Sequence, residues 1–158
     1  MKQMEIERKF LVLDLSFLNG VEGDVYKQGY LSSEENSVVR IRVTNKSAFI
    51  TIKSKVQGIS RDEFEYEIPR IDGEGLLQLC QKPIIEKMRY KIPKRDFVWE
   101  VDVFDGENKG MVVAEIELQN EDDLFEKPEW LGEEVTGDIR YYNSQLINNP
   151  YSKWKNLK

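Results

Sequence analysis

Charged and apolar residues alternate along seven segments of this chain, and this alternation limits the folds that are open to it. Near the start of the sequence, the charged residues Glu5, Glu7 and Lys9 occupy odd positions, whereas the apolar residues Ile6 and Phe10 occupy even positions. Because successive side chains of a β-strand point to opposite faces, the pattern predicts strands with one charged face and one apolar face. Most connections are short and rich in turn residues, which favours an antiparallel sheet over a parallel one.

The sequence predicts a mainly β protein with few helices. We expect eight strands, near residues 3–12, 24–31, 37–44, 47–55, 61–69, 84–92, 96–105 and 110–119. Helical patterns cover only residues 73–81, a single turn at 121–126 and a C-terminal helix at 138–146. The chain shows no repeat and no linker, so residues 1–158 are predicted to form one domain. The segment from about residue 138 is expected to pack on the barrel that these strands form.

The charges are sorted by sign from strand to strand. Basic pairs occupy residues 40/42, 53/55 and 87/89, whereas acidic rows occupy residues 63/65/67, 100/102 and 115/117. One interpretation is a set of ordinary amphipathic strands whose charged faces contact water. The sorting favours another, because solubility alone favours mixed signs and like charges two residues apart repel each other. In this second interpretation, a closed eight-stranded antiparallel barrel encloses the charged faces as a tunnel, and helices, loops or another subunit cover its apolar outside.

Composition narrows the chemistry available to such a tunnel. The chain has no His and a single Cys, Cys80, which excludes His-dependent triads, Cys–His pairs, His-ligated zinc sites and internal disulfides. A bound metal is therefore expected to be a hard cation on carboxylate oxygens. The lone Cys and the lack of a long apolar run predict a cytoplasmic protein that does not enter a membrane. The net charge of −6 disfavours nucleic acid, although sorted rows in one cavity still allow a small polyanion to bind.

The order of the charged motifs resembles that of a known family. E-x-E-x-K at residues 5–9 is followed by RIR at 40–42, TIK at 51–53, RDEFEYE at 61–67, EKMRY at 86–90, WEVDVF at 99–104, AEIEL at 114–118, WLGEEVT at 130–136 and DIRYYNS at 138–144. This series spans nearly the whole chain. It is similar to the CYTH, or triphosphate tunnel metalloenzyme, superfamily, and within it to the short bacterial members that hydrolyse inorganic tripolyphosphate.

The resemblance implies an eight-stranded antiparallel tunnel that acts on a small triphosphate with Mg²⁺ or Mn²⁺. The residues it assigns to metal binding are Glu5, Glu7, Glu115 and Glu117. The residues it assigns to phosphate binding are Lys9, Arg40, Arg42, Lys53, Lys87, Arg89 and Arg140. The candidates for the catalytic step, which requires an oriented water, are Glu63, Glu65, Asp102 and Lys87. Arg61 is expected to pair with neighbouring acids, and Arg140 could pair with Asp138 instead of reaching phosphate.

Two other functions stay open at this point. A class IV adenylate cyclase would share the tunnel chemistry but would use a ribose hydroxyl as the nucleophile, and the sequence shows no obvious purine pocket. A non-catalytic barrel could bind polyphosphate or a nucleotide as a sensor or carrier, although a pure binder needs the basic rows more than the acidic ones. The expected partner is a small-molecule triphosphate, bound by a monomer or a homodimer.

Overall fold

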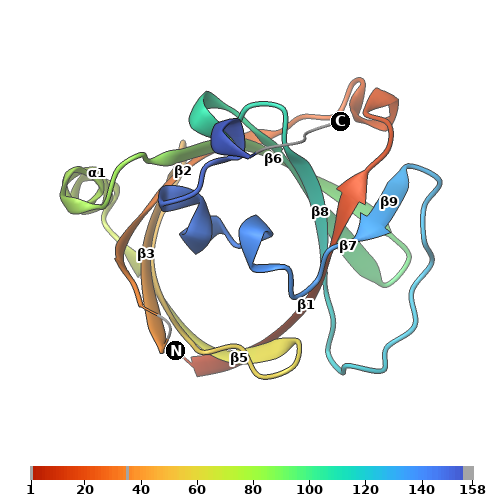
Figure 1. Ribbon diagram of the computed structural model, residues 1–158, viewed down its shortest axis with the longest axis horizontal. Coiled ribbons are helices and arrows are strands. Elements are labelled where there is room, and N and C mark those ends of the chain that lie inside the picture. The colour runs from red at the N-terminus through yellow and green to blue at the C-terminus, as the bar shows by residue number, and fades with distance from the viewer. Residues whose placement is uncertain (1, 35, 155–158) are drawn as a thin grey trace.

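The computed structural model describes residues 2–34 and 36–154 (Figure 1). Eight of its strands are β1 (Lys2–Val12), β2 (Asp24–Ser33), β3 (Ser37–Thr44), β4 (Ala48–Ser54), β5 (Ser60–Ile68), β6 (Ile85–Lys94), β7 (Phe97–Phe104) and β8 (Val112–Glu117). They form one sheet in the order β5-β4-β3-β2-β6-β7-β8-β1, and β5 also pairs with β1. All of these pairings are antiparallel. The predicted strands and the closed eight-stranded antiparallel barrel are therefore confirmed.

The charged rows of these strands lie inside the barrel. Lys9 lies opposite Glu115 across the β1–β8 pair, and Arg89 lies opposite Asp102 across the β6–β7 pair. Asp102 is fully buried, and Lys87 is 2% exposed. Ordinary amphipathic strands would leave such side chains in bulk water, so that interpretation is excluded for these rows.

A helix covers one part of the apolar outer face. Helix α1 (Arg70–Leu79) packs on β3 and β4, and it buries Leu77 and the adjacent Cys80. A Cβ atom on Gly73 would lie 2.5 Å from the Cβ of Ala48, so only glycine allows the helix to approach β4 this closely. The helix begins before the predicted residue 73 because Pro69 provides its first carbonyl, which accepts a hydrogen bond from Gly73 N–H at 3.0 Å. No helix in the described ranges is long and apolar enough to span a membrane.

Aromatic side chains from loops cover another part of the outer face. The ring of Trp99 is fully buried, with its centroid 5.7 Å from that of Phe10 and 5.6 Å from that of Phe125. Phe125 belongs to a loop that leads into β9 (Leu131–Glu134), a strand that the sequence did not predict and that pairs with β1 outside the barrel. Two short 3-10 helices, η1 (Ser16–Leu18) and η2 (Gly106–Asn108), lie in the connections that follow β1 and β7. Loops as well as a helix therefore cover the barrel, as expected.

Two predicted helical segments are wrong. Residues 121–126 form a turn followed by an extended loop, because the Asp123 carboxylate accepts hydrogen bonds from the backbone N–H groups of Gln119 and Asn120. Residues 138–146 form two short 3-10 helices, η3 (Ile139–Tyr141) and η4 (Asn143–Ile147), in place of one α-helix. Between them the backbone of Tyr142 is extended (φ −70°, ψ 129°), so the helical hydrogen bonds do not continue.

The C-terminal segment lies across one opening of the barrel (Figure 1). Its last described element is η5 (Tyr151–Lys153), and residues 155–158 of the predicted tail lie outside the described residues. Leu146 and Ile147 are buried in one apolar cluster with Phe104 of β7 and Val113 of β8. The burial of these side chains anchors the segment, so the tunnel is closed at this end.

Candidate active site

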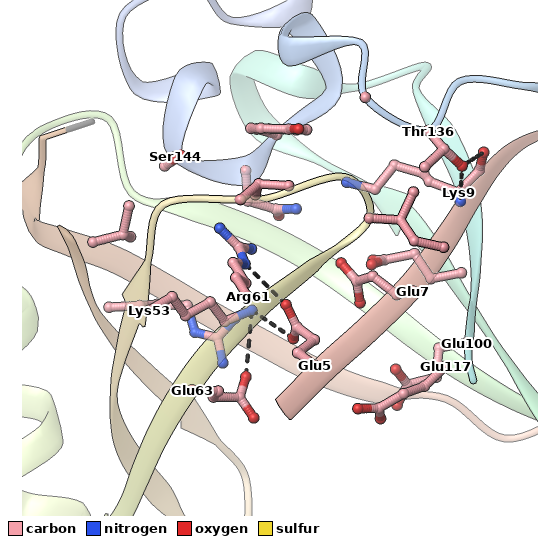
Figure 2. Close-up of a pocket in the computed structure, with 18 of the residues that line it drawn as sticks. Glu5, Glu7, Lys9, Lys53, Arg61, Glu63, Glu100, Glu117, Thr136 and Ser144 are labelled. Atoms are coloured by element: carbon pink, nitrogen blue, oxygen red, sulfur yellow. Dashed lines mark hydrogen bonds and ion pairs between the residues drawn. The ribbon is translucent and has the colours of Figure 1, made fainter. Parts of the chain in front are cut away.

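The barrel encloses a cavity of about 270 Å³, lined by side chains from all eight of its strands and from the C-terminal segment (Figure 2). Its walls carry predicted metal-binding, phosphate-binding and catalytic residues, namely Glu5, Glu7, Lys9, Arg40, Arg42, Lys53, Glu63, Glu65, Lys87, Arg89, Glu115 and Glu117. Side chains that are distant in sequence therefore meet in one chamber, as the tunnel interpretation requires. Their individual roles stay predictions.

The charge changes sign along the tunnel. At the closed end the Lys9 ammonium donates to the backbone carbonyl of Tyr141 at 2.9 Å. Glu63, Glu100 and Glu117 lie on the side away from the C-terminal segment (Figure 2). Glu100 and Glu117 also line a second pocket on the surface, so the tunnel reaches solvent at this acidic end.

Two predicted site residues do not line the cavity. Asp102 is fully buried behind the cavity wall, where it binds Lys87 and Arg89. The side chain of Arg140 is 57% exposed and lies 2.7 Å from the Asp138 carboxylate. The structure therefore shows the second of the two expectations for Arg140, a surface pair with Asp138.

Because Arg140 lies outside the cavity, we expect its removal to have little effect on turnover. Replacing Arg140 with Ala should change kcat/KM for a triphosphate by less than about twofold, as for most surface substitutions. Replacing Arg42, which lines the cavity, with Ala should lower kcat/KM by at least about 100-fold, because a charge-assisted phosphate contact is lost. Steady-state phosphate release measures both variants, and an equal loss in the two would contradict this placement.

The most buried part of the site is an ion triad on β6 and β7. Lys87 Nζ donates to Asp102 Oδ2 at 2.6 Å, and Arg89 donates to both oxygens of Asp102 at 2.7 and 2.9 Å. Burial lowers the pKa of Lys87 to about 7, with help from Arg89 and Arg42, while Asp102 opposes this shift. Burial would raise the pKa of Asp102, but Arg89 and Lys87 hold it below its ordinary value. The carboxylate therefore fixes two cations at the tunnel wall.

Two arginines crowd the wall formed by β3. Arg40 donates to Thr51 Oγ1 at 3.3 Å and lies 3.6 Å from Glu65, but its buried Nε has no hydrogen-bond partner. Burial lowers the pKa of Arg42 to about 10, and the nearby charges of Arg40 and Arg89 add to the shift. An unpartnered donor beside cations that repel one another fits a bound anion, because buried donors are normally paired.

Glu5 lies between two cations on the opposite wall. Lys53 Nζ donates to one of its oxygens at 2.8 Å, and Arg61 Nε donates to the other at 3.0 Å (Figure 2). Burial would raise the pKa of Glu5, but Lys53 and Arg61 hold it well below its ordinary value. The expected pairing of Arg61 with an acid is therefore confirmed. Glu63 lies 3.5 Å from Lys53 and joins the same group.

The acidic part of the tunnel holds carboxylates without cations. Glu7 and Glu117 face each other in the β1–β8 register. Burial raises the pKa of Glu7 well above its ordinary value, and the nearby Glu115 and Glu5 add to this shift. Burial, Glu5 and other acids raise the pKa of Glu117 to about 7. In the part of the chain that the structure describes, neither Glu7 nor Glu117 forms an ion pair, so the carboxylates repel one another.

The chemistry of these carboxylates fits a divalent cation. Among the described residues, no group of three or more His, Cys, Asp or Glu side chains is arranged to hold a metal ion. The donors are nevertheless hard oxygens, and Mg²⁺ needs only one or two protein carboxylates when a phosphate and waters complete its shell. Glu7 and Glu117 meet this requirement best, because cations already bind Glu5.

These pKa shifts predict how the stability of the metal-free protein depends on pH. Between pH 4.5 and about pH 7, the folded state binds more protons at Glu117 than the unfolded state does. The stability that this proton binding provides is therefore lost as the pH rises to about 7. Above pH 7 the lowered pKa of Lys87 acts in the opposite direction. Because Glu117 is exposed to solvent, screening limits the loss to about 1 kcal/mol, or about 2–4 °C in Tm.

Thermal melting of the chelator-treated protein from pH 5 to pH 9 tests this expectation. Tm should pass through a minimum near pH 7, and Mg²⁺ should raise Tm more at pH 7 than at pH 5. A Tm that rises steadily from pH 5 to pH 7 would show that repulsion between Glu117 and the neighbouring carboxylates does not destabilise the metal-free protein.

Sequence reasoning missed several cavity residues. Glu100 shares a strand face with Asp102 and follows the same alternation, so it could have been included. Thr136 and Asn143 also line the cavity, but they come from the C-terminal segment. No strand periodicity applies there, so no signal in the sequence placed these two side chains at the tunnel.

A closed antiparallel barrel with rows of carboxylates and cations facing one another inside it defines a polyanion-binding tunnel protein. Residues 3–148 match the CYTH domain, which covers most of the chain. The chain therefore belongs to the CYTH family, and the resemblance seen in its charged motifs is confirmed.

Individual relatives share nearly the full length of the chain. An inorganic triphosphatase of Acetivibrio thermocellus is 49% identical over 152 residues, which cover 96% of this chain and 97% of the relative. An inorganic triphosphatase of Nitrosomonas europaea is 38% identical over 148 residues, 90% of this chain and 95% of the relative. Among solved structures, a crystal structure of an inorganic triphosphatase covers 90% of this chain and 93% of its own, with 34% identity and a TM-score of 0.65. A putative adenylate cyclase of Bacillus halodurans, at 17% identity and a TM-score of 0.59, covers 76% of this chain and 83% of its own and shows the shared fold alone.

Proposed function

We propose that this protein is an inorganic triphosphatase that hydrolyses the terminal phosphoanhydride of tripolyphosphate with a divalent metal ion. The observation that carries the proposal is unneutralised charge of both signs in one chamber. Arg40 keeps an unpartnered Nε, and Arg42 pairs with no carboxylate among the described residues, while Glu7 and Glu117 lack cations there. A metal–polyphosphate complex would supply both. The two relatives named inorganic triphosphatase support this choice of substrate, since each is similar over nearly its full length.

The basic side chains of the tunnel bind the phosphate groups in this proposal. Arg40 offers its unpartnered Nε, and Arg42 and Arg89 offer guanidinium groups suited to bidentate contacts with phosphate. Lys9, Lys53 and Lys87 add point charges from β1, β4 and β6. Together these cations hold the triphosphate and stabilise the charge that develops on the oxygens of the transferred phosphoryl group.

Carboxylates orient the nucleophile in the same proposal. A water molecule attacks the terminal phosphorus, the bond to the bridging oxygen breaks, and phosphate and pyrophosphate are the products. Glu63 and Glu65 line the cavity and accept hydrogen bonds from this water, whereas Asp102 acts only through Lys87 and Arg89. Mg²⁺ or Mn²⁺, bound by Glu7 and Glu117 with Glu5 and Glu115 nearby, would neutralise charge on the phosphate oxygens.

The remaining properties follow from the same geometry. All of the cavity walls come from one chain, so a monomer would suffice for catalysis, and a homodimer would be compatible with it. A chamber of this size excludes nucleic acid helices, so the proposed partner is a small triphosphate. The whole chain acts as one domain, and its free, buried Cys80 fits a cytoplasmic location.

One assay separates this function from its alternatives. The purified protein is incubated with Mg²⁺ or Mn²⁺ and, in turn, tripolyphosphate, ATP, thiamine triphosphate and long-chain polyphosphate. Release of phosphate and pyrophosphate from tripolyphosphate supports the proposal. Formation of cyclic AMP and pyrophosphate from ATP would identify a cyclase, and tight binding without turnover would identify a carrier. Either of these last two results would overturn the proposal.

A further inference from the structure

A chain of hydrogen bonds joins the C-terminal segment to two cations of the tunnel wall. Arg42 Nε donates to Gln28 Oε1 at 3.1 Å, and Gln28 Nε2 donates to Asn143 Oδ1 at 3.1 Å. Asn143 Oδ1 also accepts from Lys87 Nζ at 3.3 Å. Gln28 is fully buried on β2, and Asn143 begins η4 at the closed end of the tunnel. Four elements, β2, β3, β6 and η4, are thus linked through two side-chain amides.

The donors at both ends of this chain fix the orientation of the two amides. Arg42 and the protonated form of Lys87 can only donate, so each then faces an amide oxygen. The oxygen of Gln28 therefore points to Arg42, which turns its NH₂ group towards Asn143. The oxygen of Asn143 accepts from Gln28 and Lys87 together. Both requirements are met by a single arrangement, so the chain has one hydrogen-bonded state.

The same contacts determine which N–H of Lys87 remains available. An ammonium group has three donors. In Lys87 one donor binds Asp102 Oδ2 at 2.6 Å and a second binds Asn143 Oδ1 at 3.3 Å. Lys87 also lines the cavity, although its side chain has no solvent-accessible surface, so its third N–H is the donor that neither Asp102 nor Asn143 occupies. Asp102 alone would leave the ammonium free to rotate about its bond to Cε.

We propose that Asn143 is a positioning residue, which aims the Lys87 ammonium at the substrate and, through Gln28, holds Arg42. This inference rests on the proposed triphosphatase function. It gives the C-terminal segment a second role beyond closing the barrel, because a side chain of η4 completes the coordination of a cation held by β6. Misplacement of a charged group by about 1 Å is enough to lower a rate by about 100-fold.

The test replaces Asn143 with Leu, which has a similar shape but accepts no hydrogen bond. With tripolyphosphate and Mg²⁺, we expect kcat to fall by about 10–100-fold while KM changes by less than about threefold. The same substitution in a Lys87→Met background should cost less than it does in the wild-type background, because only the link through Gln28 to Arg42 is then left to lose. Asn148→Leu, on the exposed end of the same segment, is the matched control and should retain wild-type turnover.

Three results would overturn the inference. These are wild-type kinetics for Asn143→Leu, a rise in KM with unchanged kcat, and equal losses in the wild-type and Lys87→Met backgrounds. If Asn143→Leu does not fold by thermal melting, Asn143→Ser, which retains an oxygen but moves it away from Lys87, replaces it. If the wild-type protein releases no phosphate, the proposed function fails independently. The inference, which rests on that function, then falls with it.

Discussion

Replacing Glu7 with Gln is expected to abolish metal-dependent turnover and to make the metal-free protein more stable. Glu7 faces Glu117, and burial together with Glu115 and Glu5 raises its pKa well above the ordinary value. A neutral amide of the same shape removes this repulsion, so Tm without metal should rise. It also removes one carboxylate from the proposed cation site, and kcat should fall by more than about 100-fold, since even indirect partners of metal ligands contribute about 10–100-fold. Phosphate-release kinetics and thermal melting measure the two effects.

A matched substitution separates the loss of charge from the loss of a ligand. Glu133 on β9 is exposed and lies outside the cavity. Glu133→Gln should leave both kcat and Tm near the wild-type values, and Mg²⁺ should raise Tm as it does in the wild type. Near-normal turnover of Glu7→Gln would remove Glu7 from the metal site. A lower Tm in the metal-free variant would show that Glu7 stabilises the fold and is not strained in it.

The alternation of charge predicted most of the barrel and of its lining. On β6, for example, Lys87 and Arg89 share one face, and the closed sheet turns that face inward. Period two is a local property of a strand, so it can be read directly from the sequence. The sorting of basic and acidic residues onto different strands predicted that the charged faces enclose a tunnel. Rows of like charge are tolerated only where opposite charges lie nearby, as Lys53 lies next to Glu5.

The parts that the sequence left undetermined depend on contacts between distant segments. Strand β9 has only four residues and forms because Phe125 and Trp130 pack beside Trp99. The C-terminal segment forms 3-10 helices whose position depends on the packing of Leu146 in an apolar cluster with Phe104 and Val113 at one end of the barrel. Neither feature has a periodicity of its own.

The role of Asp102 also needed the structure. The sequence places Asp102 on a charged strand face together with Glu100, and this placement makes Asp102 a candidate for the catalytic step. Asp102 in fact lies where two basic side chains of β6 enclose it, while Glu100 remains at the open end. Position along the barrel axis, which alternation does not encode, decides between a substrate contact and a structural anchor.

This anchoring role makes Asp102→Asn the most destabilising substitution that we predict. The variant keeps the shape of the side chain but leaves Lys87 buried without a counterion, and it leaves Arg89 with only Glu100 at 3.3 Å and Glu115 at 3.8 Å. Breaking a buried ion pair in this way costs about 3–5 kcal/mol, which lowers Tm by about 6–20 °C for a chain of this size. Turnover should fall as well, because both cations lose the carboxylate that positions them at the cavity wall.

The loss of stability in Asp102→Asn should also depend on pH, and the sign follows from Lys87. Its pKa is already about 7 in the wild type, and removal of the Asp102 charge lowers it further. At pH 9 the variant therefore holds a neutral amine, whereas at pH 6 folding must either bury an unpaired ammonium or release its proton. Chemical denaturation should show a larger loss of unfolding free energy at pH 6 than at pH 9. Part of the loss should persist at both pH values because Arg89 stays charged. Asp96→Asn, in the exposed turn between β6 and β7, should show neither effect. Equal losses at the two pH values would mean that Asp102 stabilises the barrel through Arg89 alone.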